Sequence, residues 1–509
     1  MRMSFVFAVG VAVALVVAAP DAASLDAELR AVAALAGEPR IVSAAGVTRD
    51  ETDVLTIENP DAFDAASPKR RLVLVGGADG RSADQIVALV RWFKTRAPRA
   101  LGQQWSVSAL PAASFETTDT QSLSRWVTFQ APDLLVTVGL DPLQSPMASV
   151  SLGEGEAIPS LQKLMLAPQV QSPLHSSIAA RVKRRPLDIA RVLARRYPAA
   201  PAISYIPALA WAGALRLGDI TGDASLRARV RGEVKPWIAG EKSLFGERLQ
   251  LTSVAGTLIF AEIAAAEGWE PGERAAAAAL AEEGVAAAVA EKAPAVPAHG
   301  QGWTDDMFMA SAVLARSGAR RGHETDLDAA ARLLIAYAER LQQPGGLFHH
   351  AVDGPAAWGR GNGFAAFGLI ETLTRMAPSH PSRPKLLEIY RRQMAAVRDA
   401  QAPDGAWRQI IDAPGAYREE TATAMLTTAM ARGVRLGWLD RAYLPAVQRG
   451  WRALAAHVTD DGGVVDVCSG TGAGPTRRYY FDRPAVTGGD DRGGAMALIA
   501  ALEMSELGK

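Results

Sequence analysis

The sequence predicts a multidomain protein in which an N-terminal α/β domain is followed by an all-α domain. Its 509 residues exceed the length of one average domain. In the first third, short apolar runs alternate with amphipathic stretches, whereas helical spacing of apolar residues continues from about residue 187 to the end. Lys+Arg and Asp+Glu number 54 each, so no net charge draws the chain to nucleic acid or to an anionic membrane.

Residues 1–23 have the composition of a secretory signal peptide. A basic start at Arg2 precedes an apolar run from Phe5 to Ala19 and small residues around a cleavage point near Ala23. The alternative is an uncleaved membrane anchor, but the run is shorter than the roughly 20 residues that span a bilayer. We therefore expect a periplasmic or secreted protein that has no membrane association after cleavage. Export implies no disulfide within the chain, which has one cysteine.

Residues 24–166 are expected to form the α/β domain. The stretch R-R-L-V-L-V-G-G at Arg70–Gly77 predicts a buried strand, and Ser82 is expected to cap the amphipathic helix that follows. Further strands are predicted at Trp105–Pro111 and Asp133–Leu140. Strand–helix–strand alternation is typical of a mostly parallel sheet covered by helices.

The glycine loop that follows the first predicted strand, G-G-A-D-G, offers two functional interpretations. It lacks the G-K-[ST] ending of a phosphate-binding loop, which argues against nucleotide binding. The strand and loop faintly resemble a zinc carboxypeptidase domain, in which such a strand ends in an H-x-x-E pair. No histidine lies nearer than His175, and a zinc site needs at least three protein ligands. We therefore expect a degenerate, non-catalytic domain without a metal.

Residues 167–186 contain three prolines and predict a linker, and residues 187–509 predict the all-α domain. Glycine-rich or proline-containing turns separate its amphipathic runs, which amount to five or six helical hairpins. The runs are expected at Ser204–Leu217, Ala224–Ile238, Thr252–Glu267, Glu273–Ala290, Asp305–Gly318, Thr325–Gln342, Gly361–Met376, Pro384–Ala402, Glu419–Gly437, Arg441–His457 and Asp491–Leu507.

Three motifs in the all-α domain carry the functional signal. They are G-W-T-D-D-M-F-M at Gly302–Met309, G-G-L-F-H-H-A-V-D at Gly345–Asp353 and W-G-R-G-N-G-F at Trp358–Phe364. In order and spacing they resemble the active-site frame of the unsaturated glycuronyl and rhamnogalacturonyl hydrolases, glycoside hydrolase families 88 and 105. The resemblance implies that the helices close into an (α/α)6 toroid. It also implies an enzyme that needs no metal or organic cofactor.

Hydrolysis of an unsaturated uronide differs from ordinary glycoside cleavage. The expected substrate is an oligosaccharide whose terminal uronic acid has a C4=C5 double bond, conjugated to the carboxylate. Protonation of C4 creates an oxocarbenium-like cation at C5, to which water adds. This chemistry requires one carboxyl group that first donates a proton and then accepts one from water. It also requires a cationic group for the substrate carboxylate.

The resemblance assigns the acid/base role to Asp305, which follows Trp303 in the W-x-D pattern. Taken alone, an aspartate at a helix start is more often a cap or a partner of the helix dipole. Asp306 would point about 100° away around the helix, since an α-helix has 3.6 residues per turn, and is the weaker candidate. Trp303 would contact the substrate, shield the site and raise the pKa of Asp305 by desolvation.

The resemblance also assigns substrate contacts to other residues. His350 would lie near the sugar. The alternative is a loop histidine whose hydrogen bonds are all made within the protein. Trp358 would supply an aromatic platform and Arg360 a cation, because a guanidinium pairs a carboxylate bidentately. The alternative is that W-G-R-G-N-G-F only opens a helix, with glycines that permit a tight turn. Tyr205 would be an aromatic on the first inner helix, or a core residue, and Gln409 a contact at the rim.

One departure from the family pattern keeps a second hypothesis open. The family has a further aspartate on an early inner helix, but Leu249–Leu258 contains no carboxylate. A non-catalytic carbohydrate-binding protein that keeps the toroid and its pocket is therefore the alternative function. A third hypothesis places the function in the N-terminal domain. The sequence indicates neither the uronide nor an oligomeric state.

Overall fold

The computed structural model describes residues 21–38, 40–60, 62–64, 67–113, 120–140, 149–152, 156–322 and 324–507. The chain divides into two compact units. Unit 1 consists of Met1–Val42, Thr48–Ile57 and Lys69–Val170, and unit 2 of Ser43–Val47, Glu58–Pro68 and Gln171–Lys509. Most of the expected signal peptide, residues 1–20, lies outside the described residues. Among the described residues, no helix has both the length and the apolar character needed to cross a membrane.

A six-stranded sheet with the strand order β1-β2-β4-β3-β5-β6 gives unit 1 its α/β character. Strand β3 pairs in parallel with β4 and with β5, β5 pairs in parallel with β6, and β2 is antiparallel to β4. The predicted mostly parallel sheet is therefore confirmed. The strands span Val42–Val47, Asp53–Ile57, Arg70–Gly76, Trp105–Leu110, Leu134–Val138 and Ser149–Leu152.

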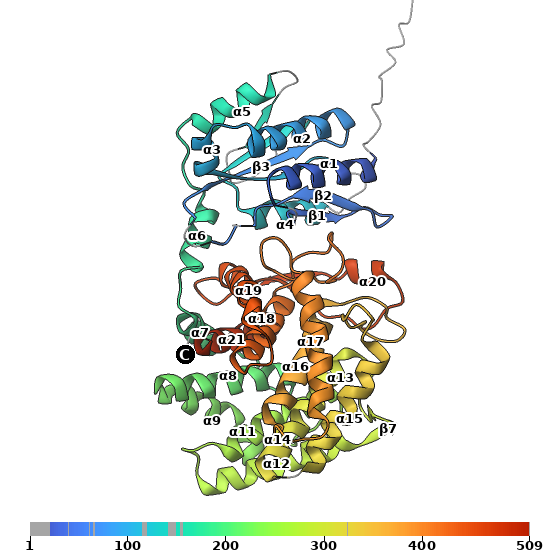
Figure 1. Cartoon of the computed structure of the whole chain (residues 1–509). Coiled ribbons are helices and arrows are strands. Elements are labelled where there is room, and N and C mark those ends of the chain that lie inside the picture. Colours follow the sequence, from blue (N-terminus) through green and yellow to red (C-terminus); the bar gives the residue numbers. More distant parts are fainter. Residues whose placement is uncertain are drawn as a thin grey trace, which may run out of the picture. The chain divides into compact units, whose positions relative to one another are not determined.

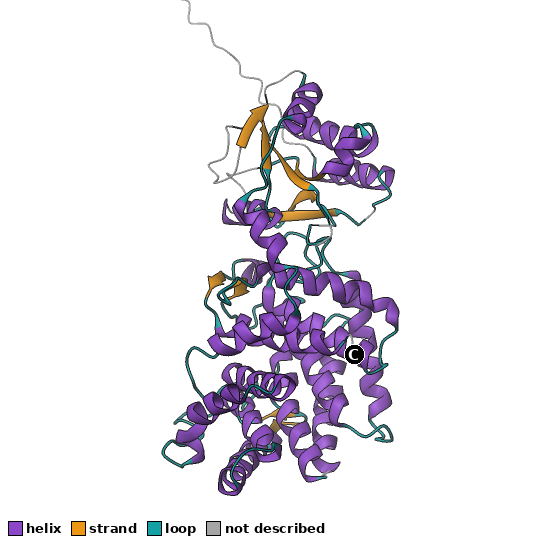
Figure 2. Ribbon diagram, turned by 90° about the vertical axis from the view of Figure 1, so that its left-hand side faces the viewer, coloured by secondary structure: helices purple, strands orange, loops and turns teal. Residues whose placement is uncertain are grey.

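Helices lie between β3 and β4 and between β4 and β5 in the chain, and helices pack on the sheet (Figure 2). Because β4 and β5 flank β3 on opposite sides, and crossovers are right-handed, α2 and α4 cover opposite faces. Helix α2 is capped by Asp79, whose carboxylate accepts from the Ser82 backbone N–H at 2.9 Å. The prediction that Ser82 is the cap is therefore wrong, because Asp79 presents its carboxylate to the first turn. The helices are α1 (Ala22–Leu35), α2 (Gly80–Thr95), α3 (Arg99–Gln104), α4 (Thr120–Gln130) and α5 (Ala157–Leu166).

Unit 2 is a closed double ring of helices (Figure 1). Each inner helix packs on the next, and α21 packs back on α8, which closes the ring. The inner helices are α8 (Tyr205–Thr221), α10 with α11 (Leu251–Gly256, Leu258–Ala265), α13 with α14 (Thr304–Met309, Ser311–Arg321), α16 (Gly359–Arg375), α18 (Glu420–Arg435) and α21 (Asp491–Glu506). The outer helices are α7 (Pro186–Arg196), α9 (Ala224–Ile238), α12 (Pro271–Val289), α15 (Glu324–Leu341), α17 (Arg383–Asp399) and α19 (Leu444–His457).

Two of the inner helices are buried over almost their whole length, because neighbours surround them. Every residue of α16 from Gly359 to Leu373 is buried, and so is every residue of α18 from Glu420 to Gly433. Their charged residues, such as Arg360 and Glu371 on α16, are therefore buried among other helices and not exposed to solvent. An outer helix returns the chain after each inner helix. All six inner helices therefore run in one direction, and their N-terminal ends meet at one end of the ring.

The structure adds elements that the sequence did not predict. Helix α6 (Pro173–Arg181) occupies part of the expected linker, and α7 follows it directly as the outer partner of α21. Small additions are the strands β9 (Val464–Cys468) and β10 (Ala485–Gly488), which pair antiparallel, and the short helix α20 (Arg477–Phe481) between them. A short 3-10 helix at Arg441–Tyr443 and the strands β7 (Glu291–Ala293) and β8 (Val296–Pro297) complete the unit.

Candidate active site

Asp305 lies in the first turn of α13 and contacts a buried histidine. Its Oδ2 atom is 3.2 Å from Nε2 of His350, whose side chain is completely buried. The other ring nitrogen of His350, Nδ1, is 3.0 Å from the hydroxyl of Tyr480. The Asp305 side chain itself is 16% exposed. One carboxylate oxygen is therefore held by the imidazole, while the group keeps access to a ligand.

Three aromatic rings surround the imidazole of His350. The ring centroids of Trp303, Trp358 and Tyr480 lie 5.3, 4.5 and 5.7 Å from that of His350. Trp358 precedes α16, so the motifs that are separate in sequence meet here. Aromatic walls exclude water, and charge interactions inside such a site are stronger than in bulk solvent.

Arg360 carries the free cationic donor of this site. Its Nη2 donates to the carbonyl of Cys468 at 2.9 Å, and its guanidinium lies 5.1 Å from the Trp358 ring centroid. Its Nη1 is buried and makes no hydrogen bond to the described part of the chain. Burial favours a lower pKa for Arg360, but the nearby negative groups, of which Glu419 contributes most, together outweigh it, so the pKa is raised and the group stays cationic. A buried, unsatisfied cationic N–H is unfavourable, and an anionic ligand would satisfy it.

Tyr205 begins α8 and belongs to the same electrostatic environment. Burial raises the pKa of its hydroxyl to about 12, with an opposing contribution from Arg360 and a further upward one from Asp305. The ring packs edge-on against Phe364 at 5.5 Å. Tyr205 is therefore a core aromatic with a neutral hydroxyl, and substrate contact by Tyr205 stays a prediction.

Gln409 lies behind the site. Its side chain is fully buried, and Nε2 donates to the backbone carbonyl of Tyr480 at 2.9 Å. This contact positions the segment that presents Tyr480 to His350. Substrate contact by Gln409 stays a prediction.

Asp306 has a different environment from its neighbour. Its Oδ2 accepts from the backbone N–H groups of Gln301 and Gly302, at 2.9 and 2.7 Å, and from the Tyr337 hydroxyl at 2.7 Å. Burial raises its pKa to about 6. These contacts fix the turn before α13 and thereby orient Asp305.

The glycines of W-G-R-G-N-G-F allow close packing and do not form a tight turn. All three lie inside α16. A Cβ at Gly361 would approach Thr304 Oγ1 to 2.5 Å, and one at Gly359 would approach the Arg408 carbonyl to 2.4 Å. The expectation of a turn is wrong. These positions require glycine because α16 approaches its neighbours, at Thr304 and Arg408, too closely for a side chain.

The structure also brings to this end of the ring three residues that are not among the predicted site residues. They are Tyr480, which contacts His350, and the ion pair of Asp490 with Arg492 at the start of α21, with a shortest distance of 2.6 Å. Both members of the pair influence the pKa of Tyr205. The D-D-R sequence at a helix start could have indicated the pair, whereas no local pattern distinguishes Tyr480 from Tyr479. The described residues from Leu249 to Leu258 supply no carboxylate, as the sequence requires.

Comparison with known proteins identifies the family of the helical unit. The model of Glycosyl Hydrolase Family 88 matches residues 184–507. The unsaturated rhamnogalacturonyl hydrolase YesR of Bacillus subtilis (strain 168) is 30% identical over 192 residues, which cover 36% of this chain and 54% of the relative. An unsaturated 3S-rhamnoglycuronyl hydrolase of Alteromonas sp. (strain LOR) is 33% identical over 113 residues, which cover 22% and 27%. The chain thus spans about half or less of the length of these relatives.

A solved structure supports the fold independently. A family 105 glycoside hydrolase of C. acetobutylicum ATCC 824 superimposes with a TM-score of 0.57 at 20% identity, covering 63% of this chain and 98% of that one. At this identity the likeness shows the fold, and the helical ring expected from the motifs is confirmed. The family match covers more than half of the chain, so this protein belongs to Glycosyl Hydrolase Family 88.

Proposed function

We propose that the helical ring hydrolyses unsaturated uronyl oligosaccharides, whose terminal sugar is a Δ4,5 galacturonyl or glucuronyl residue. The observation that carries the proposal is the buried, unpartnered Nη1 of Arg360 in the same site as the Asp305–His350 pair. A cation and a carboxyl group, enclosed by aromatic rings, are what a planar, anionic sugar requires. The activities named for the two relatives are of this class.

Asp305 would act twice in one turnover. Its protonated carboxyl donates a proton to C4, and positive charge develops at C5 and the ring oxygen. Water then adds to C5 and returns a proton to the Asp305 carboxylate. The hemiketal that forms opens, and the remaining saccharide leaves with its hydroxyl group restored. His350 lies beside Asp305 throughout and, as a hydrogen-bonding partner, keeps the carboxyl in place.

Arg360 would bind the carboxylate on C5. Its free Nη1 supplies the donor, and the Trp358 ring beside the guanidinium supplies a flat apolar surface for the sugar. Neutral sugars lack the group that Arg360 binds. The site is thereby selective for uronides.

A non-catalytic carbohydrate-binding protein is the second candidate. It is favoured by one observation, the lack of a carboxylate from Leu249 to Leu258, where the family has its further aspartate. Such a protein would bind the same oligosaccharides without turnover.

Loss of the ultraviolet absorbance of the C4=C5 bond separates the two candidates. We expect the full chain to remove this absorbance from digests made by polysaccharide lyases. Asp305→Asn should be slower by about 10²–10⁴-fold, the usual contribution of a general acid/base, while it still binds the oligosaccharides. Asp399→Asn, which alters an exposed carboxylate on α17, is the matched control and should retain activity. Binding without absorbance loss by the unaltered chain would establish the second candidate instead.

We also propose that the protein is periplasmic or secreted, on the basis of residues 1–23. Fractionation of cells of the source organism should find the mature chain outside the cytoplasm, starting near Ala23. A cytoplasmic protein that still carries Arg2 and Phe5 would contradict this proposal.

A further inference from the structure

A cavity lies toward the opposite end of the inner helices from the candidate active site. It has a volume of about 360 Å³ and is lined mainly by residues from the middle and the C-terminal halves of these helices. Arg360 and Arg375 mark the two ends of α16. They are fifteen residues apart, which at 1.5 Å per residue corresponds to about 22 Å. The cavity is therefore separate from the site of Asp305.

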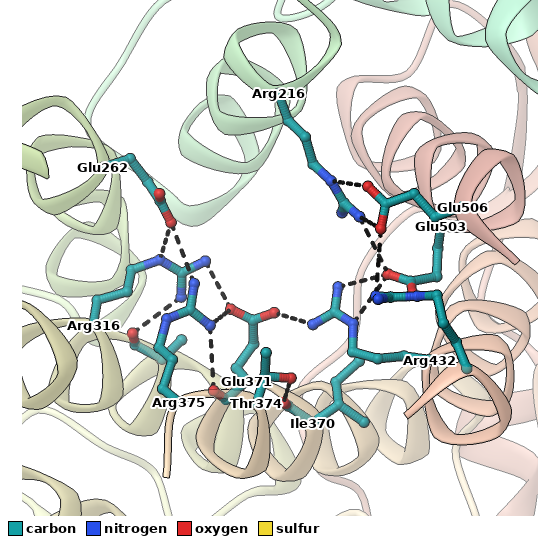
Figure 3. A network of polar contacts seen from close by, with 12 residues as sticks. Arg216, Glu262, Arg316, Ile370, Glu371, Thr374, Arg375, Arg432, Glu503 and Glu506 are labelled. Carbon is teal, nitrogen blue, oxygen red and sulfur yellow. Dashed lines mark hydrogen bonds and ion pairs between the residues drawn. The ribbon is translucent and has the colours of Figure 1, made fainter. Parts of the chain in front are cut away.

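The lining of this cavity is basic. Five arginines and three carboxylates contribute to it, and Figure 3 shows most of their charged groups pointing toward one another from different helices. Two further carboxylates, Glu503 and Glu506, pair with arginines of the lining without lining the cavity themselves. The charged lining residues are Arg216, Arg316, Arg375, Arg432, Arg435, Asp219, Glu262 and Glu371.

Part of this charge has a structural explanation. Glu371 pairs with Arg316, Arg375 and Arg432 at 2.7, 2.9 and 2.7 Å. The arginines lie where the inner helices end, so they also offset the negative ends of the helix dipoles. Arg316 and Arg375 donate to backbone carbonyls of their own helices. A network of this kind ties the helix ends together.

The network leaves several polar atoms without partners. Nε of Arg375, Nη1 of Arg216 and Nη1 of Arg435 donate no hydrogen bond within the described residues. Glu262 uses Oε1 for both of its ion pairs, with Arg316 and Arg375. Its Oε2 has no hydrogen bond or ion pair in the described structure.

Arg375 is the arginine whose charge is least compensated. Burial lowers its pKa, and repulsion from Arg316 lowers it further. Its closest contact with Glu262 is long, at 3.4 Å, and its side chain is 21% exposed. A negatively charged ligand at the free Nε would relieve this repulsion, as any nearby opposite charge does.

Apart from Thr374 and Thr428, the remaining lining is apolar. Leu209, Phe367, Ile370 and Ile499 contribute to it. A ligand that satisfies the whole cavity therefore has one anionic group, a hydroxyl group that can donate, and a compact apolar face. Its volume lies at the low end of the usual range for small-molecule pockets, which suits one sugar ring and excludes a chain of them.

We propose that this cavity binds a small polyhydroxy monocarboxylate with the chemistry of a free uronic acid. The carboxylate accepts from the free donors of Arg375 and Arg216, a sugar hydroxyl donates to Oε2 of Glu262, and the ring lies against the apolar wall. This inference goes beyond the proposed function, because the binding does not depend on Asp305 or Arg360.

The test uses the full chain and D-galacturonate as the probe, with calorimetry to measure affinity and stoichiometry. The Arg360→Met variant removes the cation of the candidate active site, so any remaining binding reports the cavity. We expect this variant to bind one molecule of D-galacturonate and not to bind D-galactose, which has no carboxylate. Adding Arg375→Gln should weaken the remaining binding at least tenfold, whereas adding Arg185→Gln, at an exposed arginine, should leave it unchanged.

A second variant distinguishes loss of the binding site from loss of the fold. Ala212→Phe fills the cavity and removes no charge, since Ala212 lines it from α8. It should abolish the same binding event while the unfolding midpoint stays near that of Arg360→Met. The proposal is overturned if Arg360→Met binds no D-galacturonate, or if Ala212→Phe and Arg375→Gln leave its affinity unchanged. Equal binding of D-galactose would overturn the carboxylate requirement. Failure of the proposed function would appear separately, as intact C4=C5 absorbance.

Discussion

Asp305 and Asp306 are adjacent in sequence but differ in what their carboxyl groups contact. Asp306 accepts from three backbone N–H groups and from Tyr337. Asp305 contacts His350 and remains partly exposed. At the scale of single residues, the two carboxyl groups therefore differ in role. Asp305 can react, and Asp306 fixes the turn before α13. The sequence predicted this division only from the angle between successive residues on a helix, and it could not give the partners.

The pKa of Asp306 should make its contribution to stability depend on pH. Burial raises this pKa from 3.8 to about 6, so the folded chain binds the proton more tightly than the unfolded chain. Its contribution is complete below about pH 4 and is lost as the pH rises through 6, by at most about 3 kcal/mol. Relative to Asp306→Asn, the unaltered chain should lose stability between pH 4 and 6 in denaturant unfolding. A difference that is constant over this range would refute the assignment.

Arg360 should discriminate between charged and neutral ligands. Arg360→Lys should weaken binding of uronide products about tenfold or more, which is about 1.4 kcal/mol, because lysine cannot reproduce the planar fork. Neutral oligosaccharides should bind equally to both proteins. Binding isotherms with a uronide and its neutral counterpart measure this, and equal losses for both would make Arg360 a structural residue.

Tyr480 illustrates why the site could be predicted only in part. Asp305, His350 and Arg360 belong to motifs whose order and spacing identify them. Tyr480 comes 130 residues after His350 in the chain and meets it through the tertiary fold. Gln409 is the opposite case. Its motif is recognisable in the sequence, but its described contact is with the backbone carbonyl of Tyr480.

At the scale of elements, the expected and observed helices agree where turn residues separate them. Helix α9 spans Ala224–Ile238 as predicted, because Gly222 and Asp223 precede it and Gly240 follows it. The sequence did not predict the interruption of two inner helices at Thr257 and Ala310. Ala310 has no proline or glycine beside it, so its local pattern is that of a continuous helix. Packing against neighbouring helices decides such breaks.

The start of α16 should not tolerate even one methyl group. In Gly361→Ala the added Cβ would meet Thr304 Oγ1 at 2.5 Å and the Trp358 ring at 2.9 Å. Overpacking of this kind typically destabilises a protein by about 1–3 kcal/mol, and here it would also move Arg360 away from Asp305. We expect a lower unfolding midpoint together with a lower kcat/KM.

Gly345→Ala is the matched control for this substitution. A Cβ at Gly345 would meet nothing within 4 Å. This variant should resemble the unaltered chain in midpoint and kcat/KM. If Gly361→Ala also resembles the unaltered chain, neither stability nor activity requires the close approach of α13 and α16.

At the scale of the whole molecule, the helical ring should fold without most of the α/β unit. A shortened chain from Gln171 to Lys509 contains every inner and outer helix of the ring. A ring of this size buries a core of its own. Circular dichroism should therefore show a helical protein with a cooperative unfolding transition.

The shortened chain should also retain loss of the C4=C5 absorbance, because each residue assigned to the site lies after Ser204. Its midpoint should be lower than that of the full chain, because unit 2 also includes Ser43–Val47 and Glu58–Pro68. A folded but inactive shortened chain would show that the α/β unit contributes to turnover. The proposed separation of roles between the units would then be wrong.

Cys468 offers a direct measure of how often the site opens. It is the only thiol in the sequence and is completely buried in β9. Its backbone N–H donates to Glu419, and its carbonyl accepts from Arg360. A thiol reagent can therefore modify the folded chain only while this segment separates from α16 and α18. The rate of labelling reports that opening, and a ligand that occupies Arg360 should slow it without any change in the reagent.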